Sequence, residues 1–284
     1  MNVECTKQAH MEDILNKARI VASKVVVDAG NIAKERFDNF TSLDEKDDYG
    51  DLITEVDHLA EDLILDVLTS AFPNHKIHSE EAGDNGLQSE WLWQVDPLDG
   101  TNNFAIGFPV FSSSITLLYK HEPILGVIYE PMVDRLFISS LNGGSFCNDV
   151  ELRIKKRDNP KKFTIAWIQG HRVQNEEKAV KLRQYIDVNC KRMMRLWAPT
   201  LQWCMLAKGD IDGIILYNSE GDDLYSGILM VKEAGGIVID FQGNDFTGMN
   251  NEPYLIACHP DNKDYFVNMV SEGLSQARAL IHTV

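Results

Sequence analysis

Two aspartates three residues apart, Asp96 and Asp99, directly follow a short apolar run. A proline stands between them and Gly100 comes next, and these residue types let the chain turn sharply just beyond a predicted strand. In such a turn both carboxylates can converge on one point, with the carbonyl of Leu98 as a candidate third oxygen donor. Oxygen ligands of this kind favour Mg²⁺ or Mn²⁺ over zinc. The segment therefore predicts a site for a hard divalent cation.

The same segment could also hold an anion, because the backbone amides of Gly100 and Thr101 would face it if a helix or tight turn starts there. An isolated group of Asp, Pro and Gly is more often a plain surface turn. Two further acidic segments exist: Glu80 and Glu81 follow a candidate strand, and residues 220–223 precede a candidate helix. Taken singly, they are typical of a solvated loop and of a helix cap. Only their combination with the aspartate pair indicates a functional site.

The 284-residue chain carries 27 Lys and Arg against 43 Asp and Glu, a net charge of −16. Such a surface repels nucleic acid and anionic lipid, so we expect neither a nucleic-acid nor a membrane partner. An acidic protein that handles an anionic substrate needs local cations, either basic side chains or bound metal. The five cysteines lack metal-type spacing, and no signal peptide or apolar run near eighteen residues is visible. These features indicate a cytoplasmic protein with free thiols.

Apolar residues recur at steps of three and four from Met11 to Phe37, which predicts a long amphipathic helix. After an acidic loop over 44–51, a second helix is expected to begin near Thr54 and end before Phe72. Five short runs with brief connections then favour a largely antiparallel sheet. Its predicted strands are Lys76–Ser79, Trp91–Val95, Ser112–Tyr119, Ile124–Tyr129 and Leu136–Ser140.

Strands and helices alternate after the basic stretch Arg153–Lys162, which is the rhythm of βαβ units. The predicted strands are Phe163–Ile168, Arg192–Leu196, Ile211–Leu216, Gly236–Asp240 and Tyr254–Ala257, and the predicted helices are Glu176–Asn189, Pro199–Lys208, Asp223–Ala234 and Asp261–Ile281. We therefore expect an α/β (α+β) protein with an antiparallel-sheet half over residues 1–152 and a βαβ half over residues 153–284.

Four segments in this order resemble the inositol monophosphatase family. They are TEVD at Thr54–Asp57, SEEAG at Ser79–Gly83, DPLDGTNNF at Asp96–Phe104, and Asp223 followed ten residues later by EAGG at Glu233–Gly236. The resemblance runs from about Lys46 to Gly236. It implies a layered αβαβα sandwich of the sugar phosphatase type, a magnesium-dependent, lithium-sensitive phosphatase activity on a small phosphorylated metabolite, and a homodimer. The implied cofactor is Mg²⁺, for which Mn²⁺ or Ca²⁺ can substitute.

The resemblance also implies roles for individual residues. The metal ligands would be Glu80, Asp96, the carbonyl of Leu98, Asp99 and Asp223, with a third ion near Asp57. Asp57 and Thr101 would orient a metal-bound water for catalysis with Glu80, and Gly100, Thr101 and Asn102 would hold the phosphate. Arg172 follows a strand where the family approaches its substrate and could touch a bulky leaving group. Divalent ions suit this reaction because they lower the pKa of bound water and neutralise phosphate charge.

Three positions depart from the pattern of family members that bind inositol. Asp222 replaces the usual aromatic before the last metal aspartate, Leu216 stands where a glutamate binds ring hydroxyls, and Trp197 enters a stretch of small residues. We therefore expect a phosphomonoesterase for inositol monophosphate or a similar polyol or sugar phosphate. The alternatives are a fructose-1,6-bisphosphatase, a nucleotide 3′-phosphatase or a histidinol phosphatase, and a non-catalytic phosphate-binding module. Trp197 and Trp203 are interpreted as core or pocket wall.

Overall fold

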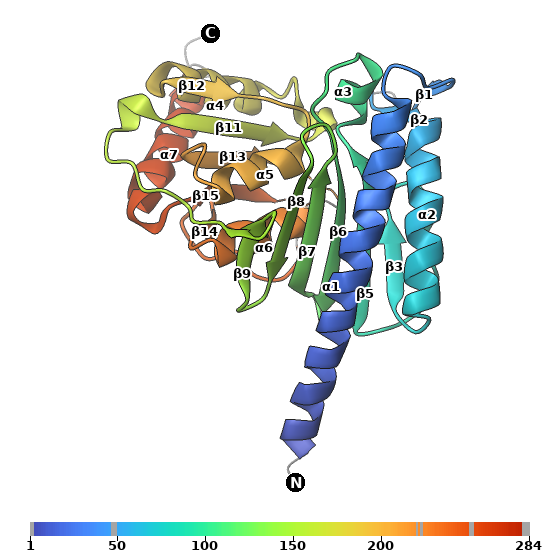
Figure 1. The fold of residues 1–284 in the computed structure, drawn as a ribbon. Helices are drawn as coiled ribbons and strands as arrows, with labels where there is room; N and C mark the ends of the chain where they lie inside the picture. The colour runs from blue at the N-terminus through green and yellow to red at the C-terminus, as the bar shows by residue number, and fades with distance from the viewer. Residues whose placement is uncertain (1–2, 47–49, 220, 222–223, 250–252, 280–284) are drawn as a thin grey trace.

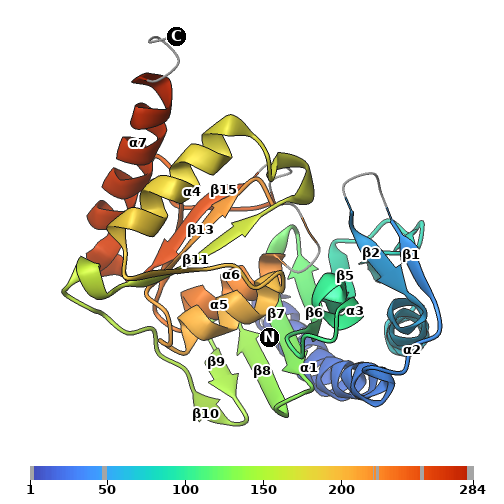
Figure 2. The same ribbon diagram turned by 90° about the horizontal axis from the view of Figure 1, so that it is seen from above.

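The computed structural model describes residues 3–46, 50–219, 221, 224–249 and 253–279. They form five layers in the order helix, sheet, helix, sheet, helix, as Figures 1 and 2 show from two directions. This confirms the expected layered αβαβα sandwich. Among the described helices, none combines the length and apolar composition that crossing a bilayer requires.

The first two layers are a pair of helices and an eight-stranded sheet. Helices α1 (Val3–Arg36) and α2 (Glu55–Ala71) cover one face of the sheet. Its strands are β3 (Lys76–Ser79), β4 (Gly83–Asp84), β5 (Trp91–Asp99), β6 (Ser112–Tyr119), β7 (Glu122–Glu130), β8 (Arg135–Ser140), β9 (Gly144–Cys147) and β10 (Val150–Glu151), in the spatial order β10-β9-β8-β7-β6-β5-β3-β4. Small buried side chains on α1, such as Ala18, Ala22 and Ala29, let this helix lie close to the sheet.

Several details differ from the sequence prediction. Strands β4, β9 and β10 were not expected, and α1 begins at Val3 instead of Met11. The acidic loop contains an antiparallel pair, β1 (Leu43–Glu45) with β2 (Leu52–Thr54). Strands β3 and β5 are parallel, because the chain returns from β4 along the sheet edge, whereas the other neighbours are antiparallel. Strand β5 continues to Asp99 instead of ending at Val95, with a register shift between Asp96 and Asp99 where Pro97 cannot donate to the ladder.

The second sheet has five strands in the order β12-β11-β13-β15-β14. They are β11 (Thr164–Gln169), β12 (Arg192–Met194), β13 (Gly213–Tyr217), β14 (Ile237–Asp240) and β15 (Tyr254–Cys258). The strands β12, β11 and β13 are parallel, as βαβ units require, and β15 is antiparallel to both of its neighbours. Helices α4 (Glu177–Asn189) and α7 (Lys263–Ala279) cover its outer face. The described cysteines Cys147, Cys190, Cys204 and Cys258 are free thiols, as expected.

The middle layer consists of α5 (Pro199–Ala207) and α6 (Leu224–Glu233), which lie between the two sheets. The second sheet has a hydrophobic core on each face, because successive side chains of a strand point to opposite faces. On β13, Ile214 and Leu216 face the middle layer, while Ile215 and Tyr217 face α4 and α7. The helices pack closely because α6 has Gly227 where a Cβ would lie 2.3 Å from Trp203 Cγ. Since α6 also packs on β7 and β8, a helix of the C-terminal half completes the core of the N-terminal sheet. The division at residues 152 and 153 stays a prediction.

Replacing Gly227 with Ala tests this close approach. The substitution favours the helix intrinsically by about 1 kcal/mol, but the new methyl group overlaps the buried indole and overpacking costs about 1–3 kcal/mol or more. We expect a net loss of about 2 kcal/mol in the free energy of unfolding, measured by urea titration. An unchanged midpoint would mean that α5 and α6 can separate without cost.

Candidate functional site

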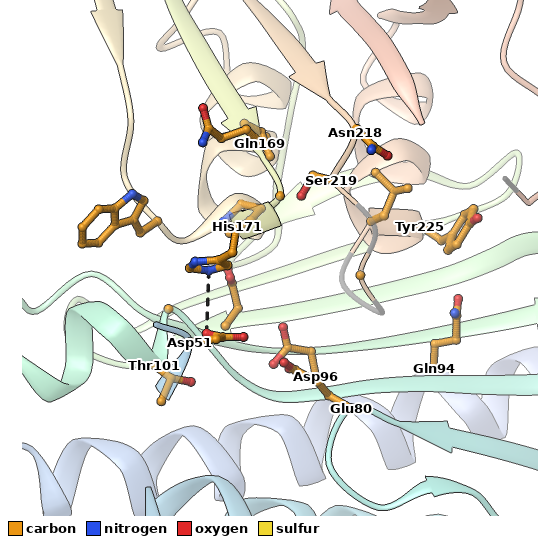
Figure 3. A pocket seen from close by; sticks show the side chains of 18 of the residues that line it. Asp51, Glu80, Gln94, Asp96, Thr101, Gln169, His171, Asn218, Ser219 and Tyr225 are labelled. Atoms are coloured by element: carbon orange, nitrogen blue, oxygen red, sulfur yellow. Dashed lines mark ion pairs between the residues drawn. The ribbon is translucent and has the colours of Figure 1, made fainter. Parts of the chain in front are cut away.

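A cavity of about 710 Å³ opens between the two sheets and is called the central cavity below. One wall comes from β3, β5 and the short helix α3 (Thr101–Ala105), and the other from the ends of β11 and β13. These two strands are parallel neighbours, so their carboxyl ends meet at one edge of the sheet, where α/β proteins place ligands. Figure 3 shows Glu80 and Asp96 pointing into the cavity from one wall, with Gln169, Asn218 and Ser219 on the other.

The turn that carries Glu80 is positioned by a buried carboxylate of α2. Glu61 Oε1 accepts a hydrogen bond from Ser79 Oγ at 2.5 Å and from the backbone N–H groups of Glu81 and Ala82 at 3.2 and 2.9 Å. These bonds satisfy the polar groups of the turn and direct the Glu80 side chain toward the central cavity. The residues of this turn do not by themselves predict a contact with Glu61, which lies about twenty residues earlier in the chain.

Lys46 is the cation nearest to this turn among the described residues. Its Nζ lies 2.7 Å from Glu80 Oε1 and 2.8 Å from Glu81 Oε1. Burial alone would lower the pKa of Lys46, but the charge of Glu80 and the hydrogen bonds to both glutamates raise it above its usual value. Lys46 therefore stays protonated and offsets part of the acidic charge of the site.

Asp57 belongs to a capping box at the start of α2. The Thr54 side chain accepts a hydrogen bond from Val56 N, and Asp57 Oδ2 accepts one from Thr54 N at 2.7 Å. The other oxygen, Oδ1, lies 2.8 Å from Thr101 Oγ1, which is also 2.9 Å from the carbonyl of Leu98. Burial raises the pKa of the Asp57 carboxyl, against the opposing effect of these hydrogen bonds. Asp57 does not line the cavity itself, but it contacts Thr101, which does.

Asp96 and Asp99 are both buried in the wall of the cavity. Asp96 Oδ1 accepts a hydrogen bond from Leu98 N at 3.1 Å, and this bond closes the turn between Asp96 and Asp99. Asp99 Oδ2 is held by the backbone N–H of Thr200 at 3.0 Å, by the Thr200 hydroxyl, and by Ser112 Oγ at 3.3 Å. Burial raises the pKa of Asp99, and the nearby charge of Glu80 adds to this. A cation between these carboxylates would favour the charged form of Asp99 and so oppose that rise in its pKa.

Gly100 makes the turn from β5 into α3. Its φ is +97°, and a Cβ there would lie 3.0 Å from the carbonyl oxygen of Val110 and 3.3 Å from the Ala198 Cβ. Asn102 then donates from Nδ2 to Asp51 Oδ1 at 3.2 Å. The same oxygen, Asp51 Oδ1, lies 3.7 Å from His171 Nε2, an ion pair between the two walls when the histidine is protonated (Figure 3).

The wall from the C-terminal half is basic and aromatic. Arg172, Arg195 and Trp197 line it, and the part of the chain that the structure describes contains no ion pair of Arg195. The Trp197 side chain is 54% exposed and its backbone φ is +52°, a conformation that costs a non-glycine residue about 1 kcal/mol. Asn103 Nδ2 holds the preceding carbonyl of Leu196 at 2.5 Å, and this contact fixes the strained turn. Trp203, in contrast, is fully buried.

Most of the candidate site residues therefore lie around one cavity. Those that line it are Glu80, Asp96, Leu98, Asp99, Gly100, Thr101, Asn102 and Arg172. Asp222 and Asp223 lie outside the described residues. Within the described residues, no group of three or more His, Cys, Asp or Glu side chains is arranged to hold a metal ion. The assigned ligand set thus stays a prediction, while its chemistry of carboxylate and carbonyl oxygens suits a hard cation such as Mg²⁺.

Several residues that shape the site were not found from the sequence. Glu61 and Thr200 act from far along the chain, and Asp51 links the two walls. Gln94, Gln202 and Tyr225 also line the cavity. No local motif marks Glu61, Thr200, Gln202 or Tyr225, because they meet the site only through the packing of separate elements. Gln94 could have been found from strand alternation, since it stands two residues before Asp96 on β5.

The fold and cavity define the class: a five-layer α/β protein with an oxygen-rich pocket between its two sheets. The sequence profile described as the inositol monophosphatase family matches residues 15–274. The chain is 31% identical over 227 residues to a protein of Aquifex aeolicus named fructose-1,6-bisphosphatase/inositol-1-monophosphatase, covering 78% of this chain and 85% of that one. It is 32% identical to the protein named Nus factor SuhB of Pasteurella multocida, covering 93% and 98%.

A solved structure of the extragenic suppressor protein suhB of Bartonella henselae is also similar. It has a TM-score of 0.82 and 28% identity, and the match covers 90% of this chain and 99% of that one. The protein belongs to the inositol monophosphatase family.

Gly100→Ala tests how closely the turn is packed, with Gly86→Ala as its control. Both glycines have positive φ, +97° and +79°, but nothing lies within 4 Å of a Cβ at Gly86. Both variants should lose about 1 kcal/mol from backbone strain, and Gly100→Ala should lose about 1–3 kcal/mol more from overlap. Urea unfolding of the two variants side by side measures the difference. Equal losses would contradict the close packing of Gly100.

Proposed function

We propose that the protein is a Mg²⁺-dependent phosphomonoesterase. The observation that carries this proposal is the gathering of oxygen donors from separate segments, Glu80, Asp96 and Asp99, on one wall of the central cavity. Membership of the inositol monophosphatase family supports it. Glu80, Asp96, the Leu98 carbonyl, Asp99 and Asp223 would hold the ions, with Asp57 near a third. When bound, divalent ions would lower the pKa of water and neutralise charge on the phosphate.

The chain's own groups would position the reactants. Backbone N–H groups of Gly100 and Thr101, with Asn102, bind the phosphate of the substrate at the start of α3. The Thr101 hydroxyl has one hydrogen, which it donates to Asp57 or to the Leu98 carbonyl, so its oxygen keeps lone pairs to accept a hydrogen bond from the attacking water. Asp57, held by the capping box, fixes the direction of this hydroxyl. Water, phosphate and the acidic wall are thereby aligned before reaction.

The leaving group would lie between the two walls, next to Trp197. Leu216, at the position where the resemblance expects a ring-binding glutamate, is 1% exposed and packs in the middle layer, so it does not contact the alcohol. Exposed Trp197 offers an apolar face instead. These features give no preference for inositol itself. Within the proposed class of polyol and sugar phosphates, inositol monophosphate remains one member.

A second candidate substrate is a sugar bisphosphate such as fructose 1,6-bisphosphate. The specific observation in its favour is Arg195, which lines the cavity near the charge of Arg183 and has no carboxylate partner among the described side chains. A second phosphate on the leaving group would pair with Arg195. The name of the Aquifex aeolicus relative includes this activity.

The partners follow from the same proposal. We propose a small phosphorylated metabolite as substrate, a homodimer as the assembly, and the cytoplasm as the location. The name Nus factor belongs to the Pasteurella multocida relative. For this chain, with its charge of −16, we propose no nucleic-acid partner.

Asp96→Asn tests the acidic wall. The change keeps the shape of the side chain and removes one negative charge, so the fold should persist while Mg²⁺-stimulated phosphate release from every substrate falls more than tenfold. The control is Asp84→Asn, which removes an acid from the edge of the same cavity where Asp84 pairs with Lys76 and His78. It should retain turnover. Retention of a tenth or more of the activity by Asp96→Asn, with circular dichroism unchanged, counts against the proposal.

Arg195→Met separates the two substrate candidates. If a second phosphate pairs with Arg195, kcat/KM for fructose 1,6-bisphosphate should fall about tenfold or more, while kcat/KM for inositol 1-phosphate should stay within about twofold. Steady-state kinetics with both substrates gives the ratio. A parallel loss for both would show that Arg195 does not select the second phosphate.

A further inference from the structure

The central cavity extends beyond Glu80 and Asp96 to an end that includes polar side chains. On β5, Trp93 and Val95 pack toward α1 and α2, so Gln94 and Asp96 face the middle layer. Figure 3 shows Gln94 and Tyr225 at the end of the cavity away from Thr101, with Asp96 and Glu80 between. The cavity-lining side chains Gln94 of β5, Gln202 of α5 and Tyr225 of α6 are together called the amide end below, after the two glutamines.

Gln202 is the residue that points to a ligand. It lies on α5, lines the cavity and is 1% exposed, yet its Nε2 has no hydrogen-bond partner among the described residues. An amide N–H group shut off from water and left without an acceptor is costly in a folded protein. A side chain of this kind on a cavity wall gains its missing bond when a ligand oxygen arrives.

Other unpartnered donors nearby do not share this position. Thr116 Oγ1 and Trp203 Nε1 are also buried without partners among the described residues, but neither residue lines the cavity. Gln202 is also held firmly. Two residues before it, Thr200 binds Asp99, and one residue after it, Trp203 packs on Gly227. The backbone of α5 at Gln202 therefore keeps a fixed position relative to the acidic wall, from which the side chain can turn toward a ligand oxygen in the cavity.

We infer that Gln202 is a specificity-determining residue whose Nε2 donates a hydrogen bond to a hydroxyl or carbonyl oxygen of the leaving group. This inference rests on the proposed phosphatase function. Gln94, Gln202 and Tyr225 are uncharged, and an amide N–H suits a hydroxyl or carbonyl oxygen. The charged residues of β3 and β4 that line the same cavity, Lys76, His78 and Asp84, are already paired with one another. The substrate class is a phosphate ester whose alcohol carries additional oxygens, a polyol or sugar, as opposed to a simple phenol or alkanol.

The experiment compares Gln202→Met with the wild type on two kinds of substrate. Methionine keeps the length and unbranched shape of glutamine and removes its polar groups. Inositol 1-phosphate and fructose 1,6-bisphosphate supply leaving groups with hydroxyls, and phenyl phosphate supplies one without. The control is Thr116→Val, which deletes a buried unpartnered hydroxyl that does not line the cavity. Melting temperature is measured for each variant.

For Gln202→Met we expect kcat/KM for the better polyol ester to fall about tenfold, the equivalent of one hydrogen bond. The value for phenyl phosphate should stay within about twofold. Thr116→Val should leave both values unchanged. A higher melting temperature for Gln202→Met with an unchanged ratio would overturn the inference, because the amide would then be a packing defect only. Equal losses on both substrates, or a wild type that prefers phenyl phosphate, would overturn it as well.

The same experiment distinguishes failure of the proposed function from failure of the role of Gln202. Wild-type protein that releases no phosphate from phenyl phosphate or from either polyol ester with Mg²⁺ overturns the phosphatase proposal itself. Wild-type turnover with an unchanged ratio in Gln202→Met overturns only the role of Gln202.

Discussion

The whole site depends on keeping several carboxylates close together away from water. Burial and mutual repulsion both disfavour the charged form, and this is why the pKa values of Asp57 and Asp99 are raised. Each carboxylate is therefore tied by hydrogen bonds, Asp57 by the capping box and Asp99 by Thr200. The remaining electrostatic cost is what a divalent cation or Lys46 can offset. In the proposed enzyme, the same repulsion would favour the binding of a divalent cation.

The layered architecture provides the rigidity that this arrangement needs. Asp99 is bound from the first turn of α5, and α5 is locked against α6 by the contact of Trp203 with Gly227. Because α6 packs on both sheets, the acidic wall and the opposite wall belong to one continuous core. The cavity lies where the two halves meet, so a substrate in contact with both walls would be recognised by residues of both halves.

The two walls serve different purposes in the proposed reaction. The acidic wall carries the residue types of the family motifs, and the chain belongs to that family. The C-terminal half contributes Trp197 in a strained backbone conformation, a basic residue at Arg195 and the amide of Gln202, whose Nε2 has no partner among the described residues. Backbone strain and an unmet hydrogen bond are costly in a folded chain, and a bound ligand would compensate for the missing bond. In the proposed reaction, side chains outside the family motifs would therefore select the alcohol.

The sequence by itself determined the local features. Hydrophobic periodicity placed most helices and strands within a few residues, and Thr54 with Asp57 marked the start of α2, because these signals depend on neighbours along the chain. The order of acidic motifs indicated the family and the layered fold. The limits of β5 were wrong, since a proline in the ladder was read as a strand end although the chain continues beside β6.

Only the tertiary structure decided which distant groups meet. Glu61 holds the turn of Glu80, Thr200 holds Asp99 across 101 residues, and Gln202 faces the cavity without a partner. Side chains of these types occur throughout any soluble protein, and nothing in their immediate neighbours distinguishes them. Their roles arise from long-range packing of sheets and helices, which fixes distances that no spacing along the chain specifies.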